Sequence, residues 1–260
     1  MGLRLHTLHD GFNYITGGLP QEGITNLWGR PSSGKTAIAR MIVRDLSRTK
    51  PVLAYPTDTS LYGQDGDHYI LREPNYELGL SQCLDWLADG GVVIIDELSP
   101  MFPNSPATGA TGRMIAHFLQ TAKLVMSDTG GALIITSQVR KEGGAYAYQN
   151  PVSAYVDMEV RLKQKEAVND DIGDRIGRWT LLDVKRNREL RPHTKGRLFI
   201  RVQKAERGMT PVDGLIDGAF LRGDIHISGT WWNLAGTKAQ GRENLYRLLR
   251  ESHWQPSCDK

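Results

Sequence analysis

The sequence predicts an α/β fold with a mostly parallel central sheet that antiparallel strands extend. Strand-like and helix-like apolar patterns alternate through the first 138 residues, which is typical of strand–helix–strand units. Residues 92–96 and 132–138 begin as unbroken apolar runs, as strands covered on both faces do. After Gln138 apolar and polar residues alternate instead, at 156–162 and 197–202, which favours antiparallel strands.

The elements of the first half follow in order. Residues 24–28 form an apolar strand candidate, and 52–55 form a second that ends at Pro56. Helical spacing of apolar residues follows the first strand, and a helix over 76–88 is stopped by Gly90-Gly91. Residues 100–111, rich in Pro, Gly, Ser and Thr, are expected to form a loop. An amphipathic helix is then marked by Met114, Ile115, Phe118, Leu119, Ala122 and Val125.

The second half is expected to add strands and then a small unit. Residues 140–151 are predicted to be a loop, and 179–184 are a further strand candidate. Past Gly208 come apolar residues, the pair Trp231-Trp232 and a last helix over 241–251 with arginines on its outer face. Those arginines are solvated or bind nucleic acid. We therefore expect a core over residues 1–208 and a small C-terminal α/β region over 209–260.

Composition is that of a soluble globular protein. Of the 260 residues, 40% are hydrophobic and 23% charged, and the net charge of +3 permits a polyanionic partner without requiring one. The two cysteines, Cys83 and Cys258, stand in no metal-binding or redox spacing, so reduced thiols in a cytoplasmic protein are expected. No signal peptide or apolar run of membrane length is visible, so no membrane partner is expected.

A phosphate-binding loop is the most specific motif in the chain. It follows the first strand and precedes a helix, with the spacing Gly-x4-Gly-Lys-Thr. Its residues, the candidates for nucleotide binding, are Gly29, Arg30, Pro31, Ser32, Ser33, Gly34, Lys35 and Thr36, followed by Ala37. Backbone amides and the helix N-terminus would cradle phosphates there. Lys35 would reach the terminal phosphates and the Thr36 hydroxyl would hold Mg²⁺.

Polar residues end the other strand candidates. Asp96 follows a buried run and is expected to support Mg²⁺ from the carboxyl end of its strand. Asp58 and Gln138 stand at or just beyond two further strand ends. Because ligands bind at the carboxyl ends of strands in open α/β sheets, one site could gather all of them.

These motifs and several others resemble the RecA family of ATP-dependent DNA strand-exchange proteins, in a short form of the kind that a phage encodes. The resemblance covers most of the chain and is most specific at its end. It runs through Gly17-Gly18-Leu19-Pro20, the phosphate loop, Val93-Ile94-Ile95-Asp96, Ile134 to Arg140, Gly143 to Pro151, Lys185-Arg186-Asn187-Arg188, Ser228 to Trp232 and Gly241-Arg242-Glu243-Asn244. It implies a RecA-like P-loop ATPase core with ATP and Mg²⁺ as cofactors.

The resemblance also implies roles for individual residues. Asp58 falls at the family's catalytic glutamate, one methylene shorter, and Glu97 is the alternative base. Gln138 falls at the sensor that links the γ-phosphate to DNA. Arg186 and Arg188 match two lysines that reach a neighbour's ATP site, where arginine also supplies positive charge; the alternative is a charged strand end in solvent. A further residue, Tyr62, either lies against the adenine or is a surface tyrosine.

Two loops correspond to the family's DNA-binding loops, at residues 100–112 and 141–153. Rings on a Gly-rich, partly basic loop suit single-stranded DNA, because any base can stack on a ring while cations meet phosphates. The candidates for DNA contact are Arg140, Lys141, Gly143, Gly144, Tyr146, Tyr148 and Asn150. Both loops look shorter than in bacterial RecA, and no room remains before Gly17 for the usual N-terminal arm.

The resemblance leads to two functional hypotheses. The first is an ATP-dependent recombinase that assembles on single-stranded DNA as a filament and pairs it with homologous duplex DNA. The second is an accessory protein, a recombination mediator or mutagenesis-associated paralogue, that binds ATP and partners without exchanging strands. The missing arm and trimmed loops motivate the second. A hexameric helicase on the same core is disfavoured by the RecA-like ending.

Overall fold

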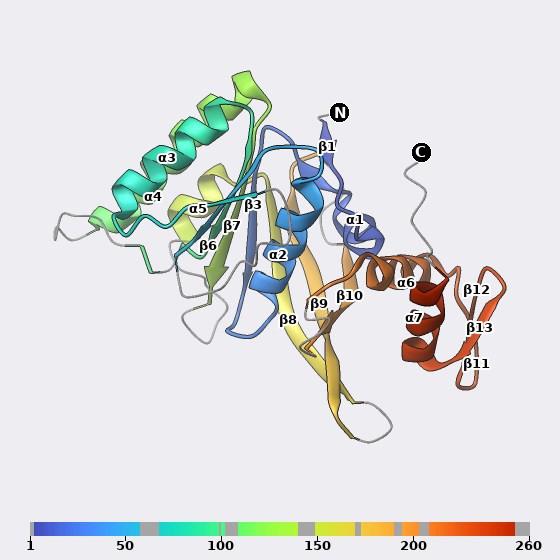
Figure 1. Ribbon diagram of the computed structural model, residues 1–260. Coiled ribbons are helices and arrows are strands. Elements are labelled where there is room, and N and C mark those ends of the chain that lie inside the picture. Colours follow the sequence, from blue (N-terminus) through green and yellow to red (C-terminus); the bar gives the residue numbers. More distant parts are fainter. Residues whose placement is uncertain are drawn as a thin grey trace.

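An eight-stranded mixed sheet forms the centre of the molecule in the computed structural model (Figure 1). The structure describes residues 3–57, 68–98, 100–101, 109–139, 149–169, 173–189, 194–202 and 208–252. The strand order is β10-β9-β8-β3-β7-β6-β4-β5. Its strands are β3 (Ile24–Gly29), β4 (Val52–Pro56), β5 (His68–Ile70), β6 (Val92–Asp96), β7 (Ala132–Gln138), β8 (Met158–Asn169), β9 (Arg175–Asn187) and β10 (Lys195–Arg201).

Strand direction divides the sheet as the sequence predicts. All pairings from β5 through β4, β6, β7 and β3 to β8 are parallel, whereas β8–β9 and β9–β10 are antiparallel. Every residue of β6 is buried, and so is all of β7 except Gln138, as an internal parallel strand requires. The predicted fold class is therefore confirmed. Beyond the sheet, β8 and β9 continue together as a two-stranded arm (Figure 1).

Helices cover both faces of the parallel part (Figure 1). On one face α2 (Lys35–Leu46) packs its apolar side, with Ile38 and Ile42, against Leu27 and Ile94. On the other face lie α3 (Tyr76–Ala88), α4 (Ala110–Thr129) and α5 (Gln149–Tyr155). Two separate apolar cores, one on each side of the sheet, result. No helix of the described ranges is both long enough and apolar enough to cross a membrane.

Two helices begin inside segments that the sequence predicts to be loops. Residues 110–112 already belong to α4, which begins after Gly109 in the left-handed conformation. Residues 149–151 belong to α5, so Asn150, a predicted loop residue for DNA contact, lies on an exposed helical turn instead. The low helix propensity of Gly, Thr, Asn and Pro favoured a loop at both places. These residues are nevertheless tolerated in the first turn of a helix. The predicted strand at 156 begins only at Met158.

The first residues form a small structure against the C-terminal part. Strands β1 (Arg4–Leu5) and β2 (Leu19–Pro20) pair, and α1 (Asp10–Thr16) lies between them in the chain. His9 caps α1, since its Nδ1 accepts a hydrogen bond from Phe12 N at 3.2 Å. Gly11 packs against α6 so closely that an added Cβ would lie 2.8 Å from Cβ of Asp217.

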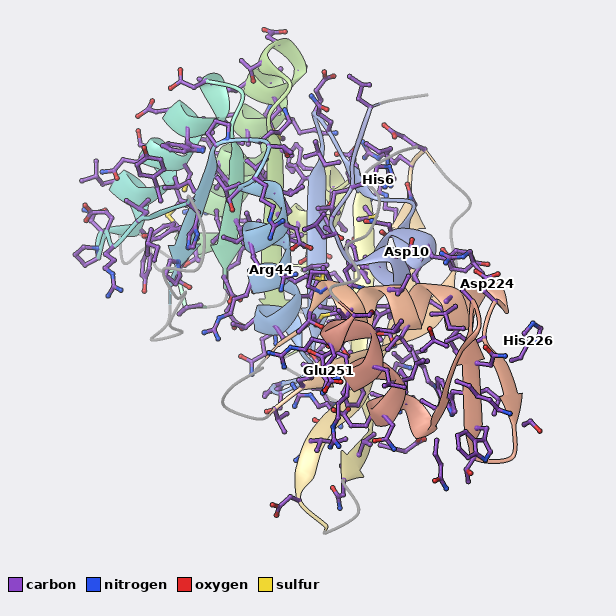
Figure 2. The ribbon with its side chains drawn as sticks, turned by 45° about the vertical axis from the view of Figure 1, so that its right-hand side comes forward. His6, Asp10, Arg44, Asp224, His226 and Glu251 are labelled. Carbon is purple, nitrogen blue, oxygen red and sulfur yellow. The ribbon has the colours of Figure 1, made fainter. Side chains whose placement is uncertain are left out.

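Residues 211–251 form a unit with a core of its own. It contains α6 (Pro211–Arg222), the three-stranded sheet β11 (His226–Ser228), β12 (Trp231–Leu234) and β13 (Thr237–Gln240), and α7 (Gly241–Glu251). Figure 2 labels Asp10 of α1 and Asp224 just after α6, and Arg222, the last residue of α6, forms an ion pair with each of them. The boundary at residue 208 stays a prediction.

A buried network of charges joins this unit to the sheet. The Arg201 guanidinium of β10 forms two hydrogen bonds to the Asp213 carboxylate of α6, at 3.0 and 3.1 Å. Arg242 of α7 bridges Asp213 and Asp217, each at 2.9 Å. The second Asp217 oxygen accepts from Phe199 N at 2.8 Å. Each buried charge therefore has partners from another element, and removing one would leave the remaining buried charges only partly compensated.

His9 borders this network and sets a pH dependence for stability. Its Nε2 lies 3.9 Å from Asp217, and both side chains are fully buried. Burial lowers the pKa of His9 to about 3, against the opposing attraction of Asp213. The folded protein thus keeps His9 neutral while the unfolded chain takes up a proton below about pH 6.5, so this residue costs stability as pH falls. Burial raises the pKa of Asp217 to about 6, and that residue contributes the opposite slope below pH 6.

We predict that His9→Asn makes stability less sensitive to acid. Asparagine keeps a capping oxygen for α1 but cannot titrate. Between pH 7 and pH 5 the wild type should lose about 2 kcal/mol more unfolding free energy than the variant, from the unfolded histidine alone. Urea unfolding at both pH values measures the difference. Equal losses in the two proteins would contradict a neutral buried His9.

Candidate nucleotide site

The phosphate loop lies between β3 and α2, where the sequence predicts it. Its backbone takes left-handed angles at Ser32 (φ 60°) and at Gly34 (φ 104°), which is the N-cap of α2. No side chain caps that helix, so its first amides face the loop without a side-chain acceptor. Curled amides at a helix N-terminus form a cradle for anions.

Glycine is required on both sides of the loop for steric reasons. A Cβ on Gly29 would lie 2.5 Å from the Leu162 carbonyl oxygen of β8 and 2.6 Å from Ser33 Oγ. One on Gly34 would lie 2.5 Å from Ile200 Cδ1 of β10, in a backbone conformation that L side chains rarely adopt. Strands β8 and β10 therefore pack closely against the loop, which the motif alone does not reveal.

Lys35 folds back over the loop and meets an acidic side chain. Its Nζ lies 3.4 Å from the Gly29 carbonyl oxygen, 3.3 Å from that of Arg30 and 3.8 Å from Glu97 Oε2. The side chain is only 7% exposed. A buried ammonium among carbonyl oxygens and one carboxylate is stabilised where a nucleotide's terminal phosphates would approach.

The acidic pair at the end of β6 is held by two threonines that the sequence analysis missed. Asp96 is 2% exposed, and its Oδ1 accepts from Thr136 Oγ1 at 2.6 Å. Thr57 Oγ1 accepts from the Glu97 amide at 2.9 Å and donates to the Glu97 carbonyl. Thr57 directly follows β4, and Thr136 is the residue at which the apolar run of β7 gives way to polar residues; that change was the available signal.

Gln138 joins the same edge of the sheet. It pairs with Gly29 in the parallel register of β3 and β7, and the following amide, Val139 N, donates to the Gly29 carbonyl at 3.1 Å. Gly29, Asp96 and Gln138 thus lie at the same ends of their parallel strands, as predicted from strand direction, and the side chains of Lys35 and Glu97 meet there as well. Asp58, Tyr62, Arg140, Lys141, Gly143, Gly144, Tyr146 and Tyr148 lie outside the described residues.

The two predicted cross-subunit arginines are not at this edge. Arg186 pairs with Glu159, which pairs with Asn26, three residues before Gly29 on β3. At ~3.3 Å per strand residue, Arg186 starts about 10 Å from the loop along the sheet. Its Nη1 donates to the Ser153 carbonyl of α5, while Arg188 contacts Ala154 O and Asp157. Both guanidiniums therefore contact α5 and do not reach the phosphate loop of their own chain.

Comparison with known proteins finds similarity to bacterial RecA along nearly the whole chain. Protein RecA of Salinispora arenicola is 25% identical, over 91% of this chain and 74% of that protein. Protein RecA of Acidothermus cellulolyticus is 24% identical over 91% and 75%, and that of Lactobacillus acidophilus 26% over 90% and 71%. No protein-family model matches the chain. The chain is thus RecA-like in sequence at low identity, and its sheet and helices agree with a RecA-like core.

We predict that Gly34→Ala destabilises the protein, because the methyl group would collide with Ile200 and the backbone would be strained. The loss should be about 1–3 kcal/mol. Gly112→Ala is the matched control, since Gly112 lies in α4 with no atom near its added Cβ, and it should be neutral or stabilising. Thermal unfolding compares the two. Equal stability would show that the loop tolerates a side chain there.

Proposed function

We propose that this protein is an ATP-dependent recombinase that assembles on single-stranded DNA as a filament and promotes homologous pairing and strand exchange. The low-identity similarity to RecA supports the class. The observation that carries the finer proposal is the separation of two half-sites. The phosphate loop, Asp96 and Glu97 occupy one edge of the sheet, whereas Arg186 and Arg188 occupy the other. Only a second copy can bring them together.

The residues at the loop fit a nucleotide with Mg²⁺. Within the described part of the chain, no cluster of three or more His, Cys, Asp or Glu side chains forms a ready metal site. Mg²⁺ commonly takes few protein ligands and completes its shell with phosphate oxygens and water. Thr36 and Asp96 would hold it here. When bound, it offsets the negative charge on the transferred phosphoryl group.

Glu97 is the best-placed described carboxylate to orient the attacking water. Its carboxylate lies beside Lys35, and Thr57 holds its backbone from both sides. Asp58 follows Thr57 by one residue and remains the alternative from the family resemblance. Either one would orient the water, while Lys35 would bind the terminal phosphates and Gln138 would sense the γ-phosphate.

Arginines from a neighbouring copy would complete the site. A guanidinium on the γ-phosphate stabilises charge that develops in the transition state. ATP between two copies would then hold them together, and hydrolysis would loosen the contact. Gln138 lies three residues before the predicted DNA loop at residues 141–153, so nucleotide state and DNA contact would be linked through it. Arg140, Lys141, Gly143, Gly144, Tyr146, Tyr148 and Asn150 remain the proposed DNA contacts.

We predict that the site residues fall into two complementation groups. Lys35→Ala, Glu97→Gln and Arg188→Ala should each abolish ATP hydrolysis stimulated by single-stranded DNA. Mixing Arg188→Ala with either of the others should restore roughly a quarter of the wild-type rate, because random neighbours create intact head-to-tail contacts. A mixture of Lys35→Ala with Glu97→Gln should stay inactive. Absence of any rescue would contradict a shared site.

Strand exchange separates the recombinase from an accessory protein. With ATP, the wild type alone should pair single-stranded DNA with homologous duplex and not with an unrelated duplex. Electron microscopy with a non-hydrolysed ATP analogue should show filaments on single-stranded DNA. Dispersed monomers and no pairing would defeat the recombinase proposal and leave the accessory function. Lys35→Ala serves as the control without productive nucleotide binding.

A further inference from the structure

We propose that Asp157 is a positioning residue that holds Arg188 ready for the nucleotide of the neighbouring subunit. The inference rests on the proposed function. Asp157 lies between α5 and β8, at the edge of the sheet opposite the phosphate loop. No pattern in the sequence marks it, since a single aspartate between two elements is ordinary.

The Asp157 carboxylate is itself firmly placed. Its Oδ2 accepts from Ile24 N at 2.9 Å, and its own amide donates to the Ile24 carbonyl at the same distance. Ile24 is the first residue of β3, the strand that leads into the phosphate loop. Only 13% of the Asp157 side chain is exposed. Whatever this carboxylate holds is thereby fixed relative to the sheet.

The other oxygen holds two cations. Asp157 Oδ1 accepts from Lys123 Nζ at 2.6 Å and from Arg188 Nη1 at 3.1 Å. Arg188 Nη2 donates to the Ala154 carbonyl at 3.3 Å. Two cations and one carboxylate leave the cluster with a net positive charge, so the pairing does not cancel the attraction of Arg188 for phosphate.

Arg188 is held and yet accessible. Its side chain is 42% exposed, and the contacts to Asp157 and Ala154 engage only part of its five N–H donors. An arginine loses much rotamer freedom when a ligand fixes it. Because Asp157 fixes it beforehand, less rotamer freedom is lost when Arg188 meets the charge that develops on the neighbour's γ-phosphate in the transition state. The carboxylate therefore acts through Arg188 and touches no reacting atom.

The same contacts reach α5, whose first turns lie within the predicted DNA loop at residues 141–153. Arg186 donates to the Ser153 carbonyl and Arg188 to that of Ala154, both in the last turn of α5. Cations at a helix C-terminus satisfy carbonyls that lack intrahelical partners. The helix begins at Gln149, directly after residues 140–148. A DNA-induced shift of α5 would thus move the arginines with it.

The test uses Asp157→Asn in the full chain. The amide keeps an acceptor for Ile24 N and removes the charge that orients Arg188. We expect DNA-stimulated turnover of ATP to fall about tenfold with little change in KM, because the interaction acts in the transition state. Glu166→Gln, which makes the same carboxylate-to-amide change in the exposed ion pair with Arg197, is the matched control and should stay within about twofold of the wild type.

Mixing shows whether the defect lies in the arginine half-site. Lys35→Ala supplies an intact Asp157 and Arg188 and should rescue Asp157→Asn, whereas Arg188→Ala should not. No rescue by Lys35→Ala, or a rise in turnover of Asp157→Asn alone, would overturn the inference. Asp157→Glu, which keeps the charge and an acceptor, should retain partial activity and carries the same mixing test if the asparagine variant does not fold.

The two proposals fail differently. If Arg188→Ala itself is not rescued by Lys35→Ala, the shared site of the proposed function falls, and the role of Asp157 falls with it. If Arg188→Ala is rescued and Asp157→Asn is not, only the role of Asp157 is wrong.

Discussion

Strand direction is the constraint on which the rest of the structure depends. Parallel pairing of β3 with β7, and of β7 with β6, brings Gly29, Gln138 and Asp96 to one edge of the sheet. The turn back from β8 to β9 reverses the chain and carries Arg186 and Arg188 to the other edge. A single polypeptide therefore holds two incomplete halves of what we propose is one ATP site, and it cannot join them by any local movement of side chains.

Much of this arrangement was predictable from the sequence. Apolar runs such as 92–96 and a loop with fixed glycine spacing are local signals, and the strands at which they end must be neighbours in an α/β sheet. The contacts that support the site were not predictable. Thr57, Thr136 and Ile200 come from separate strands, and only the folded register places them beside Glu97, Asp96 and Gly34. Asp157 is the clearest example, because its partners Ile24, Lys123 and Arg188 lie on β3, on α4 and just after β9. The helical starts at Ala110 and Gln149 were missed because polar and Gly-containing first turns look like loops.

The C-terminal unit depends on a different kind of interaction. It has its own small apolar core, yet ion pairs among Arg201, Asp213, Arg242 and Asp217 attach it to β10. Buried pairs of this kind add little net stability over apolar packing but are costly to break. They specify one orientation of α6 and α7 against the sheet. Arg44 of α2 also donates to the Met209 carbonyl at 2.6 Å, so the helix that begins at the phosphate loop is connected to the start of the same unit.

The placement of the two halves on opposite edges has a consequence for stoichiometry. In a row of copies joined head to tail, the first subunit presents a phosphate loop without a donor and the last presents arginines without a recipient. If the proposed shared site is correct, a row of n subunits would contain n − 1 complete sites, and ATP turnover per subunit would rise with the length of the row. The two ends also differ chemically, so growth and loss of subunits need not occur at the same end.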